Sequence, residues 1–175
     1  MTFASSENDI TAEEFKHAFR LHPGGVAIVT ADIGDGPKAM TITSMFSVSV
    51  DPPTLVFSAS AMSSSTPTVL SAETVVVHML SSDDIDLAKL CATSGSARFG
   101  DEVDWDRLPT GEPFYPRSSS WIRGRVVDRV NVHGSVLVVV EALEAKPPNE
   151  DSARNAVPLI YHNRNWFGLG GSAIL

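Results

Sequence analysis

Two groups of hydroxyl side chains are the part of this sequence with the most evident chemical use. One group lies along the alternating segment 39–50, and the other lies just before an apolar pair; the members are Thr41, Thr43, Ser44, Ser47 and Ser49, and Ser63, Ser64, Ser65 and Thr66. Backbone N–H groups at the start of a helix, joined by hydroxyl donors, form a binding site for a phosphate. The alternatives are a plain N-cap for the second group and the solvent face of an edge strand for the first.

Arg98 and Phe99 add a cation and an aromatic ring further along the chain. The guanidinium can pair with a phosphate oxygen while the ring covers a flat aromatic ligand. The alternative is a solvated arginine beside a phenylalanine of the core. Together with the hydroxyl groups, these residues indicate a β-barrel that binds a phosphate-bearing ligand.

Composition and spacing exclude several other kinds of site. The five histidines form no helical i, i+4 pair, and the single cysteine, Cys91, follows a helical pattern typical of a buried thiol. No metal site is therefore expected. The sequence also contains neither the Gly-x-Ser-x-Gly elbow of a hydrolase nor a glycine-rich nucleotide loop.

The overall charge excludes a further set of partners. The chain has 175 residues, a formal net charge of −8 and a pI of about 5.0, which argue against binding to nucleic acid or to an anionic membrane. No apolar run approaches the roughly 20 residues that cross a bilayer. Since no signal peptide is visible at the N-terminus, the expected location is cytoplasmic.

The elements that must position these side chains are mostly strands. Residues 1–10 are predicted to be a disordered tail, and a capping box at Thr11 and Glu14 predicts a helix over 11–20. Short helices are predicted after Ser65 and after Asp84, and strands over 26–30, 39–50, 54–58, 74–80, 121–130 and 135–145, with a hairpin over 159–167. Residues 93–118 are expected to form a long loop of the kind that is functional or covers another part of the protein.

This order of elements predicts one domain over residues 11–175. It has no β-α-β alternation and no repeat of 20–50 residues. The predicted fold is mainly β with helical insertions, arranged as an antiparallel barrel. A tight corner is expected at Asp51-Pro52-Pro53, because proline cannot donate to a strand ladder.

The order of the motifs resembles the flavin reductase-like family. The run MTITSMFSVSVDPP at residues 40–53 is similar to the family signature M-T-V-[NS]-[SA]-F-x-S-V-S-x-D-P-P. The segments 64–66, 98–105 and 158–162 are similar to its S-x-T, [KR]-F-x-G-x-x-W and P-L-[LV]-Y-[HR] motifs. The resemblance covers about residues 12–169 and implies the FMN-binding split barrel, an antiparallel barrel of the Greek-key type.

The resemblance also implies a function, which is the reduction of FMN or FAD by NADH or NADPH to supply a separate monooxygenase. It implies a homodimer with the flavin near the interface. The isoalloxazine edge and ribityl chain are then assigned to Thr41, Thr43, Ser44, Met45 and Ser47. The phosphate is assigned to Ser64, Ser65, Thr66 and Arg98, and the expected flavin contacts also include Phe99 and His162.

The sequence departs from the family where a contact to nicotinamide is expected. The family has Gly-Asp-His in a hairpin, and this chain has His133-Gly134-Ser135, so Ser135 takes the histidine position. His133 and Ser135 are both candidates to position the nicotinamide. No general base is expected, because hydride transfer is the chemistry of the cofactors themselves.

Three functions stay open at this point. They are a flavin reductase, a protein that holds flavin without reducing it, and a barrel that binds no flavin. Oxidation of NADH or NADPH with added FMN or FAD distinguishes the first from the others. Quenching of flavin fluorescence distinguishes the second from the third.

Overall fold

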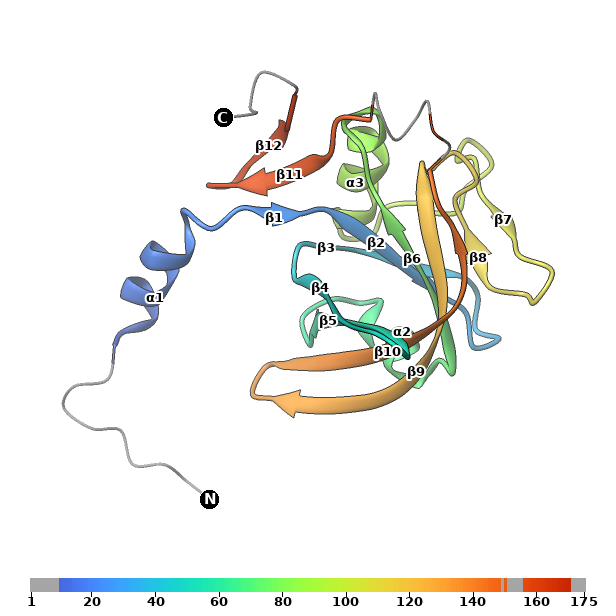
Figure 1. The fold of residues 1–175 in the computed structure, drawn as a ribbon, viewed down its shortest axis with the longest axis horizontal. Helices are drawn as coiled ribbons and strands as arrows, with labels where there is room; N and C mark the ends of the chain where they lie inside the picture. Colours follow the sequence, from blue (N-terminus) through green and yellow to red (C-terminus); the bar gives the residue numbers. More distant parts are fainter. Residues whose placement is uncertain (1–9, 149, 151–155, 171–175) are drawn as a thin grey trace.

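A seven-stranded antiparallel sheet forms the frame of the molecule (Figure 1). The computed structural model describes residues 10–148, 150 and 156–170, so the predicted tail lies outside the described residues except for Ile10. The order of the strands is β3-β2-β6-β9-β10-β5-β4. Their bounds are β2 (Ala27–Ala31), β3 (Lys38–Ile42), β4 (Met45–Val50), β5 (Pro53–Ser60), β6 (Thr74–Met79), β9 (Ser120–Val132) and β10 (Ser135–Lys146).

Two smaller sheets flank the large one. β1 (Gly24–Gly25) pairs with β11 (Leu159–His162), which pairs with β12 (Asn165–Gly168), and β7 (Asp106–Arg107) pairs with β8 (Pro113–Phe114). β1 leads almost directly into β2, so the three-stranded sheet lies at one end of the large sheet (Figure 1). The prediction of a mainly β, antiparallel fold is confirmed.

The two edge strands of the large sheet follow one another in the chain. β3 pairs with β2 and β4 pairs with β5, at opposite ends of the strand order, and only Thr43 and Ser44 separate β3 from β4. The sheet therefore curves until its two edges meet at this two-residue link. The prediction of one continuous strand over 39–50 is wrong, because the chain changes its pairing partner at the link.

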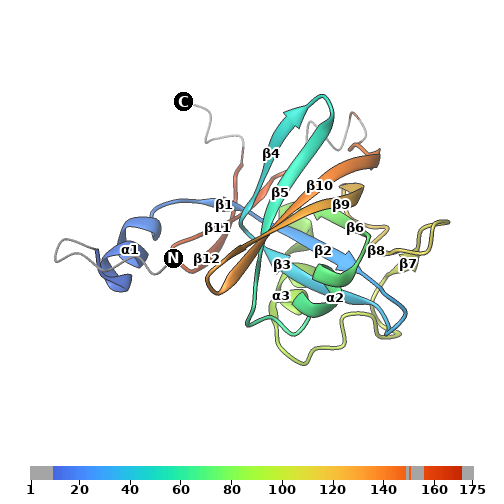
Figure 2. The same ribbon diagram turned by 90° about the horizontal axis from the view of Figure 1, so that it is seen from below.

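The helices are short, and two of them cover the same strands. α2 (Thr66–Ser71) and α3 (Ile85–Ala92) both pack against β2 and β3, and the 3-10 turn η1 (Ser82–Asp84) precedes α3 (Figure 2). α1 (Ala12–Phe19) stands apart from the sheet and buries none of its residues (Figure 1). Among the described residues, no helix is both long and apolar enough to cross a bilayer.

β2 lies between two hydrophobic cores. All five of its residues are buried, and they alternate: Val29 faces a core enclosed by the curved sheet, whereas Ile28 faces a core under α3. The first core contains Phe57 and Val138, from β5 and β10. A strand buried on both faces has a continuous apolar sequence, which explains the run at 26–29.

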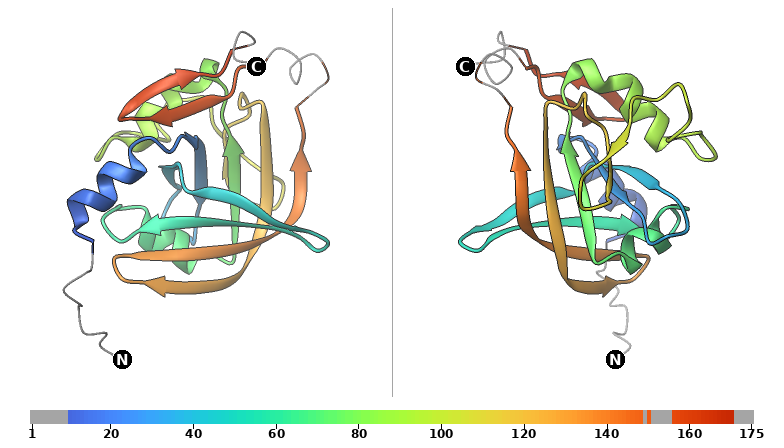
Figure 3. Two further views of the ribbon diagram at one scale, coloured as in Figure 1. Left: turned by 60° about the vertical axis from the view of Figure 1, so that its left-hand side comes forward. Right: turned by 90° about the vertical axis from the view of Figure 1, so that its right-hand side faces the viewer.

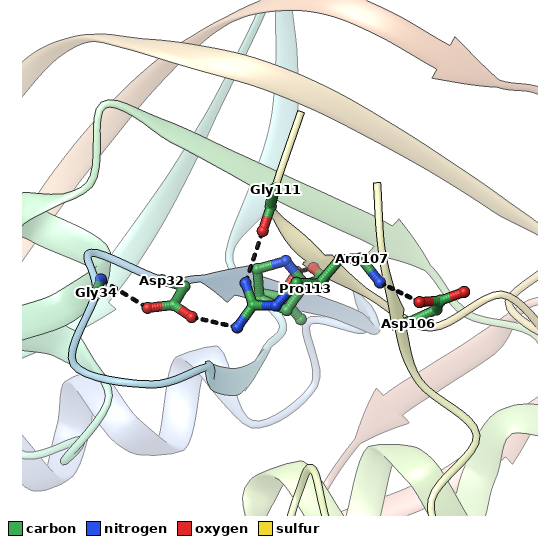
Figure 4. A network of polar contacts seen from close by, with 7 residues as sticks. Asp32, Gly34, Asp106, Arg107, Gly111 and Pro113 are labelled. Atoms are coloured by element: carbon green, nitrogen blue, oxygen red, sulfur yellow. Dashed lines mark hydrogen bonds and ion pairs between the residues drawn. The ribbon is translucent and has the colours of Figure 1, made fainter. Parts of the chain in front are cut away.

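The segment 93–118 covers the second core and contains a short hairpin that was not predicted. Tyr115 is fully buried in this core beside Cys91. Figure 4 shows how the β7–β8 hairpin is attached: Arg107 donates to Asp32 Oδ2 (2.6 Å) and to the carbonyl of Gly111 (2.7 Å). Burial acts to raise the pKa of Asp32, but Arg107 and the N–H of Gly34 outweigh it and hold that pKa below its usual value.

His78 on β6 connects this segment to the large sheet. Its Nδ1 lies 3.2 Å from the carbonyl oxygen of Ile28, and its Nε2 accepts the N–H of Tyr115 at 3.1 Å. The ring is therefore neutral, with its proton on Nδ1. Complete burial lowers the pKa of His78 to about 4, against a smaller opposing effect of the hydrogen bond to Ile28.

We expect the free energy of unfolding to fall as the pH decreases below about 6.5. The folded protein keeps His78 neutral down to about pH 4, whereas the unfolded chain binds a proton near pH 6.5. Between these values the unfolded state binds more protons, so this group lowers the stability by at most about 1.4 kcal/mol for each pH unit of acidification. Urea unfolding at several pH values between about 7 and 5 measures the slope.

The matched variants are His78→Gln and His17→Gln, a buried and an exposed histidine. His78→Gln should flatten the pH dependence of stability, and His17→Gln should preserve it. Equal slopes in the wild type and His78→Gln would contradict the role given to His78.

Candidate functional site

The link Thr43-Ser44 stands between two neighbouring cavities. We call the first, of about 370 Å³, the polar cavity; it is lined by Met40, Thr41, Ile42, Thr43, Ser44, Ser58, Ser60, Met62, Ser63, Ser64, Cys91, Ala92, Ser94 and Arg98. We call the second, of about 660 Å³, the apolar cavity; it is lined by Phe15, Lys16, Phe19, Arg20, His22, Gly24, Thr43, Ser44, Met45, Phe46, Ser58, Leu137, Tyr161, Asn163 and Arg164. Thr43, Ser44 and Ser58 belong to both, so the cavities adjoin at the link.

Hydrogen bonds to β5 hold the link in place, and Gly24 leaves room for it because glycine has no side chain. Ser58 donates its N–H to the carbonyl of Ser44 (3.0 Å), and Ser44 Oγ donates to the carbonyl of Ser58 (3.2 Å). A Cβ atom on Gly24 would lie 2.7 Å from the carbonyl oxygen of Thr43. Only glycine therefore lets β1 approach the link this closely.

The polar cavity presents hydroxyl groups from β3, the link, β5 and the start of α2. Thr41 Oγ1 already donates to the carbonyl of Ala88 at 2.7 Å. The hydroxyls of Thr43 and Ser64 are exposed and make no hydrogen bond with the described residues, so they are available to a ligand. Hydroxyls suit a ligand with a polyol chain and a phosphate, because each can donate and accept.

Arg98 lines the polar cavity, but most of its donors bond within the protein. Its Nη1 donates to the carbonyl of Ala39 and to Ser65 Oγ, and its Nη2 donates to the carbonyl of Thr93. Its Nε donates to Ser96 Oγ at 3.3 Å. Arg98 thus joins β3, the start of α2 and the end of α3, and leaves one N–H for a ligand.

Ser65 and Thr66 differ from the predicted N-cap group. Ser65 is buried in the helical conformation and makes no cap bond; its hydroxyl donates to the carbonyl of Ala39 at 2.7 Å. Thr66 Oγ1 donates to the carbonyl of Ser60 at 2.6 Å. Ser65 does occupy the N-cap position of α2, but its hydroxyl accepts from Arg98 Nη1 and caps no N–H of the helix.

Rings and apolar side chains form most of the apolar cavity. Phe15 and Phe19 of α1 lie on one side, and Met45 and Phe46 of β4 line another part. Tyr161 of β11 pairs with Gly24 across the small sheet. These surroundings can cover the faces of a flat aromatic ligand.

Five of the expected contact residues line neither cavity: Ser47, Ser65, Thr66, Phe99 and His162. Ser47 is exposed on β4, and His162 lies near Phe167, with ring centroids 6.0 Å apart. Phe99 packs in the second core against Trp105 and Tyr115, and it lines a further cavity of about 610 Å³ with Ser64, Ser65 and Arg98.

The two nicotinamide candidates lie at the β9–β10 turn. His133 is exposed in the two-residue turn, with a φ of 49°. Ser135 pairs with Ser60 across β10 and β5, and Ser60 lines the polar cavity. The structure therefore brings Ser135 beside the wall of the site and His133 to the tip of the hairpin.

Cys91 is a wall residue that the sequence indicated only as a buried thiol. It is buried on α3, with Sγ 3.4 Å from Tyr115 Oη. Burial raises the pKa of Cys91 to about 11, so the thiol is protonated at neutral pH and is a poor nucleophile. Cys91 therefore offers no reactive thiolate to the polar cavity at neutral pH.

The two joined cavities fit the flavin that the resemblance implies. A flavin mononucleotide has a flat ring system at one end and a hydroxylated chain ending in a phosphate at the other. The apolar cavity matches the first part and the hydroxyl groups with Arg98 match the second. Thr43 and Ser44 then lie where the two parts of the ligand meet.

Comparison with known proteins identifies the family. Residues 19–170 match the flavin reductase like domain. The chain is 38% identical over 160 residues to the NADH:FMN oxidoreductase of Rhodococcus qingshengii, which covers 90% of this chain and 82% of the relative.

Two solved structures are similar along nearly their whole length. One is the flavin reductase domain protein from Arthrobacter sp. FB24, with a TM-score of 0.82, 30% identity, and coverage of 90% of this chain and 95% of that one. The other is BorF, the flavin reductase component of a bacterial two-component tryptophan halogenase, with a TM-score of 0.79, 25% identity, and coverage of 91% and 98%. The fold is therefore the split barrel of flavin reductases.

We expect Arg98→Ala to destabilise the folded protein by about 1.5–3 kcal/mol, because it removes hydrogen bonds from a charged donor that connects three segments. Urea unfolding followed by circular dichroism measures the loss. Lys89→Ala removes an exposed cation from α3 and serves as the control. An unchanged unfolding midpoint for Arg98→Ala would show that these bonds contribute nothing.

Proposed function

The chain belongs to the flavin reductase-like domain family, and we propose that it reduces FMN with NADH and passes the reduced flavin to a separate monooxygenase. FAD and NADPH are the alternative substrates. The observation that carries the proposal is the pair of cavities joined at Thr43-Ser44. The flavin and the nicotinamide supply the redox chemistry, a hydride transfer to flavin N5, and the protein supplies binding and orientation.

Each part of the flavin has proposed contacts among the residues described above. Met45 and Phe46 cover the ring system, and Thr43 and Ser44 bond the ring edge and the ribityl chain. Ser64 and the remaining N–H of Arg98 hold the phosphate, with Ser65 positioning Arg98 through its hydroxyl. The absence of an acidic or basic catalyst from this set agrees with a reaction that needs no proton transfer by the protein.

A second function has one observation in its favour, the serine at the family's histidine position. If neither Ser135 nor His133 positions the nicotinamide, the protein would hold flavin without reducing it. Ser135 lies next to the polar cavity through its pairing with Ser60, which supports a role for Ser135 in the reductase.

Steady-state oxidation of NADH and NADPH with added FMN and FAD tests the proposed function. We expect turnover that requires flavin. Flavin binding without oxidation of either nicotinamide would identify a flavin-holding protein instead. If the protein quenched the fluorescence of neither FMN nor FAD, both the reductase and the flavin-holding function would be contradicted.

We propose further that the chain acts as a homodimer through the outer face of β4, β5, β10 and β9, which lie side by side in Figure 3. Large apolar side chains are exposed there: Val48 and Val50 are 57% and 91% exposed, and Val130 and Val132 are 45% and 43% exposed. Exposed apolar side chains on one sheet are a feature of protein–protein interfaces. Phe46 belongs to the same strand and lines the apolar cavity, so this interface would border the flavin site.

We expect the double variant Val48→Asp/Val130→Asp to be monomeric, because it places charges in the proposed interface. Light scattering after size-exclusion chromatography measures the mass. Ile33→Asp, an exposed apolar residue between β2 and β3, is the control and should leave the dimer intact. A wild-type monomer, or a dimeric double variant, would contradict the proposed interface.

We expect Thr43→Val to weaken flavin binding about tenfold, since one lost hydrogen bond corresponds to about 1.4 kcal/mol. Fluorescence titration with FMN measures the dissociation constant. Thr54→Val removes a hydroxyl at the other end of β5, which bonds only Pro52 of its own turn. Equal affinities of Thr43→Val and Thr54→Val for FMN would show that the link does not contact the flavin.

A further inference from the structure

α1 is ordered by local interactions but contributes nothing to the core. Its capping box is complete, with the N–H of Glu14 donating to Thr11 Oγ1 (3.2 Å) and the N–H of Thr11 donating to Glu14 Oε2 (2.8 Å). None of its residues is buried. Phe15 and Phe19, four residues apart, form a ring pair with centroids 4.9 Å apart on the side that lines the apolar cavity. The helix therefore forms one wall of the apolar cavity and adds little to the stability of the barrel.

The apolar cavity is also strongly cationic. Lys16 and Arg20 of α1 and Arg164 of the β11–β12 turn all line it, together with His22, and no aspartate or glutamate does. This is notable in a chain with 21 acidic and 13 basic residues and a net charge of −8. A local excess of positive charge in an acidic protein attracts an anionic ligand.

The three cations are available to a ligand. Arg20 and Arg164 form no side-chain hydrogen bond or ion pair with the described residues. Lys16 pairs with Glu13 at 2.8 Å, but the two side chains are 60% and 81% exposed. An exposed pair of this kind contributes less than about 1 kcal/mol and exchanges readily for a ligand phosphate.

The flavin phosphate does not account for these cations. In the proposed binding mode, that phosphate lies in the polar cavity with Ser64 and Arg98, on the other side of the link from α1. These cations and the phenylalanine rings beside them suit a second ligand that bears phosphate and an aromatic base. NADH has this chemistry, with a pyrophosphate that pairs with cations and an adenine that stacks on phenylalanine rings.

We infer that Lys16, Arg20 and Arg164 bind the phosphates of an adenine dinucleotide, and that the dinucleotide is the nicotinamide substrate. The inference rests on the proposed function and assigns the substrate contacts that the hairpin candidates leave undefined. The adenylate half of FAD carries the same chemistry, so the test uses FMN as the flavin. With FMN, only the nicotinamide substrate brings an adenine dinucleotide to the enzyme.

The test compares the wild type with Lys16→Gln/Arg20→Gln at saturating FMN. The expected result is an increase of at least tenfold in the KM for NADH, with kcat and the dissociation constant of FMN unchanged. With a reduced nicotinamide riboside, which has no phosphate, the two proteins should react at the same rate. The KM of the wild type for NADH should also rise with salt, and that of the variant should change less.

Lys89→Gln/Lys146→Gln is the control for net charge, since both lysines are exposed outside the cavity and the change in charge is the same. Its KM for NADH, and the rise of that KM with salt, should equal those of the wild type. Because α1 buries no residue, the melting temperature of Lys16→Gln/Arg20→Gln should also match that of the wild type.

Three results would overturn the inference. One is an unchanged KM for NADH in the double variant. Another is an equal loss of rate with the reduced nicotinamide riboside. The last is a higher dissociation constant for FMN with an unchanged KM for NADH. The last result would assign the cations to the flavin phosphate. Failure of the proposed function is distinct from all three, because the wild type would then oxidise no NADH with any flavin.

Discussion

The short connection between the two edge strands is the constraint on which the rest of the structure depends. β3 and β4 pair with strands at opposite ends of a seven-stranded order, yet two residues join them. The sheet can satisfy both pairings only by curving until its edges meet. Ser58 fixes the junction through two hydrogen bonds to Ser44, and Gly24 makes room for it from the small sheet. The junction divides the surface into a polar and an apolar cavity, and this division matches the two ends of a flavin.

Two buried titratable groups near the second core stay uncharged at neutral pH. Burial keeps the Cys91 thiol protonated and the His78 ring neutral at neutral pH. Both groups contact Tyr115 of the segment 93–118. Cys91 on α3 lies against the Tyr115 hydroxyl, and His78 on β6 accepts the Tyr115 backbone N–H. The residues that would contact ligands are hydroxyls, rings and cations. Such a set suits a reaction in which two bound cofactors exchange a hydride and the protein aligns them.

The sequence predicted the composition of the site better than its internal bonding. The hydroxyls of Thr43 and Ser64 were recognisable from their positions, and the structure brings both to one cavity. Ser65 and Arg98 were also predicted as ligand contacts, but they bond chiefly to each other and to Ala39. Spacing along the chain cannot show in which direction a hydroxyl points, so this difference was not predictable.

The strand break and the role of α1 were missed for related reasons. Alternation continues from residue 39 to residue 50 without glycine or proline, so nothing local indicates that the pairing partner changes at Thr43. The spacing of Phe15 and Phe19 predicted a helix correctly, but an apolar helical face predicts burial and does not distinguish a core from a cavity. Both features depend on contacts between distant segments. The buried strand β2, in contrast, was evident because its own composition requires burial on both faces.

The most direct test of the account is a crystal structure of the protein with FMN. We expect the isoalloxazine ring in the apolar cavity against Met45 and Phe46, the ribityl chain beside Thr43 and Ser44, and the phosphate at Ser64 and Arg98. Flavin density whose phosphate lies at Lys16 and Arg20, or flavin bound away from the Thr43-Ser44 link, would contradict it.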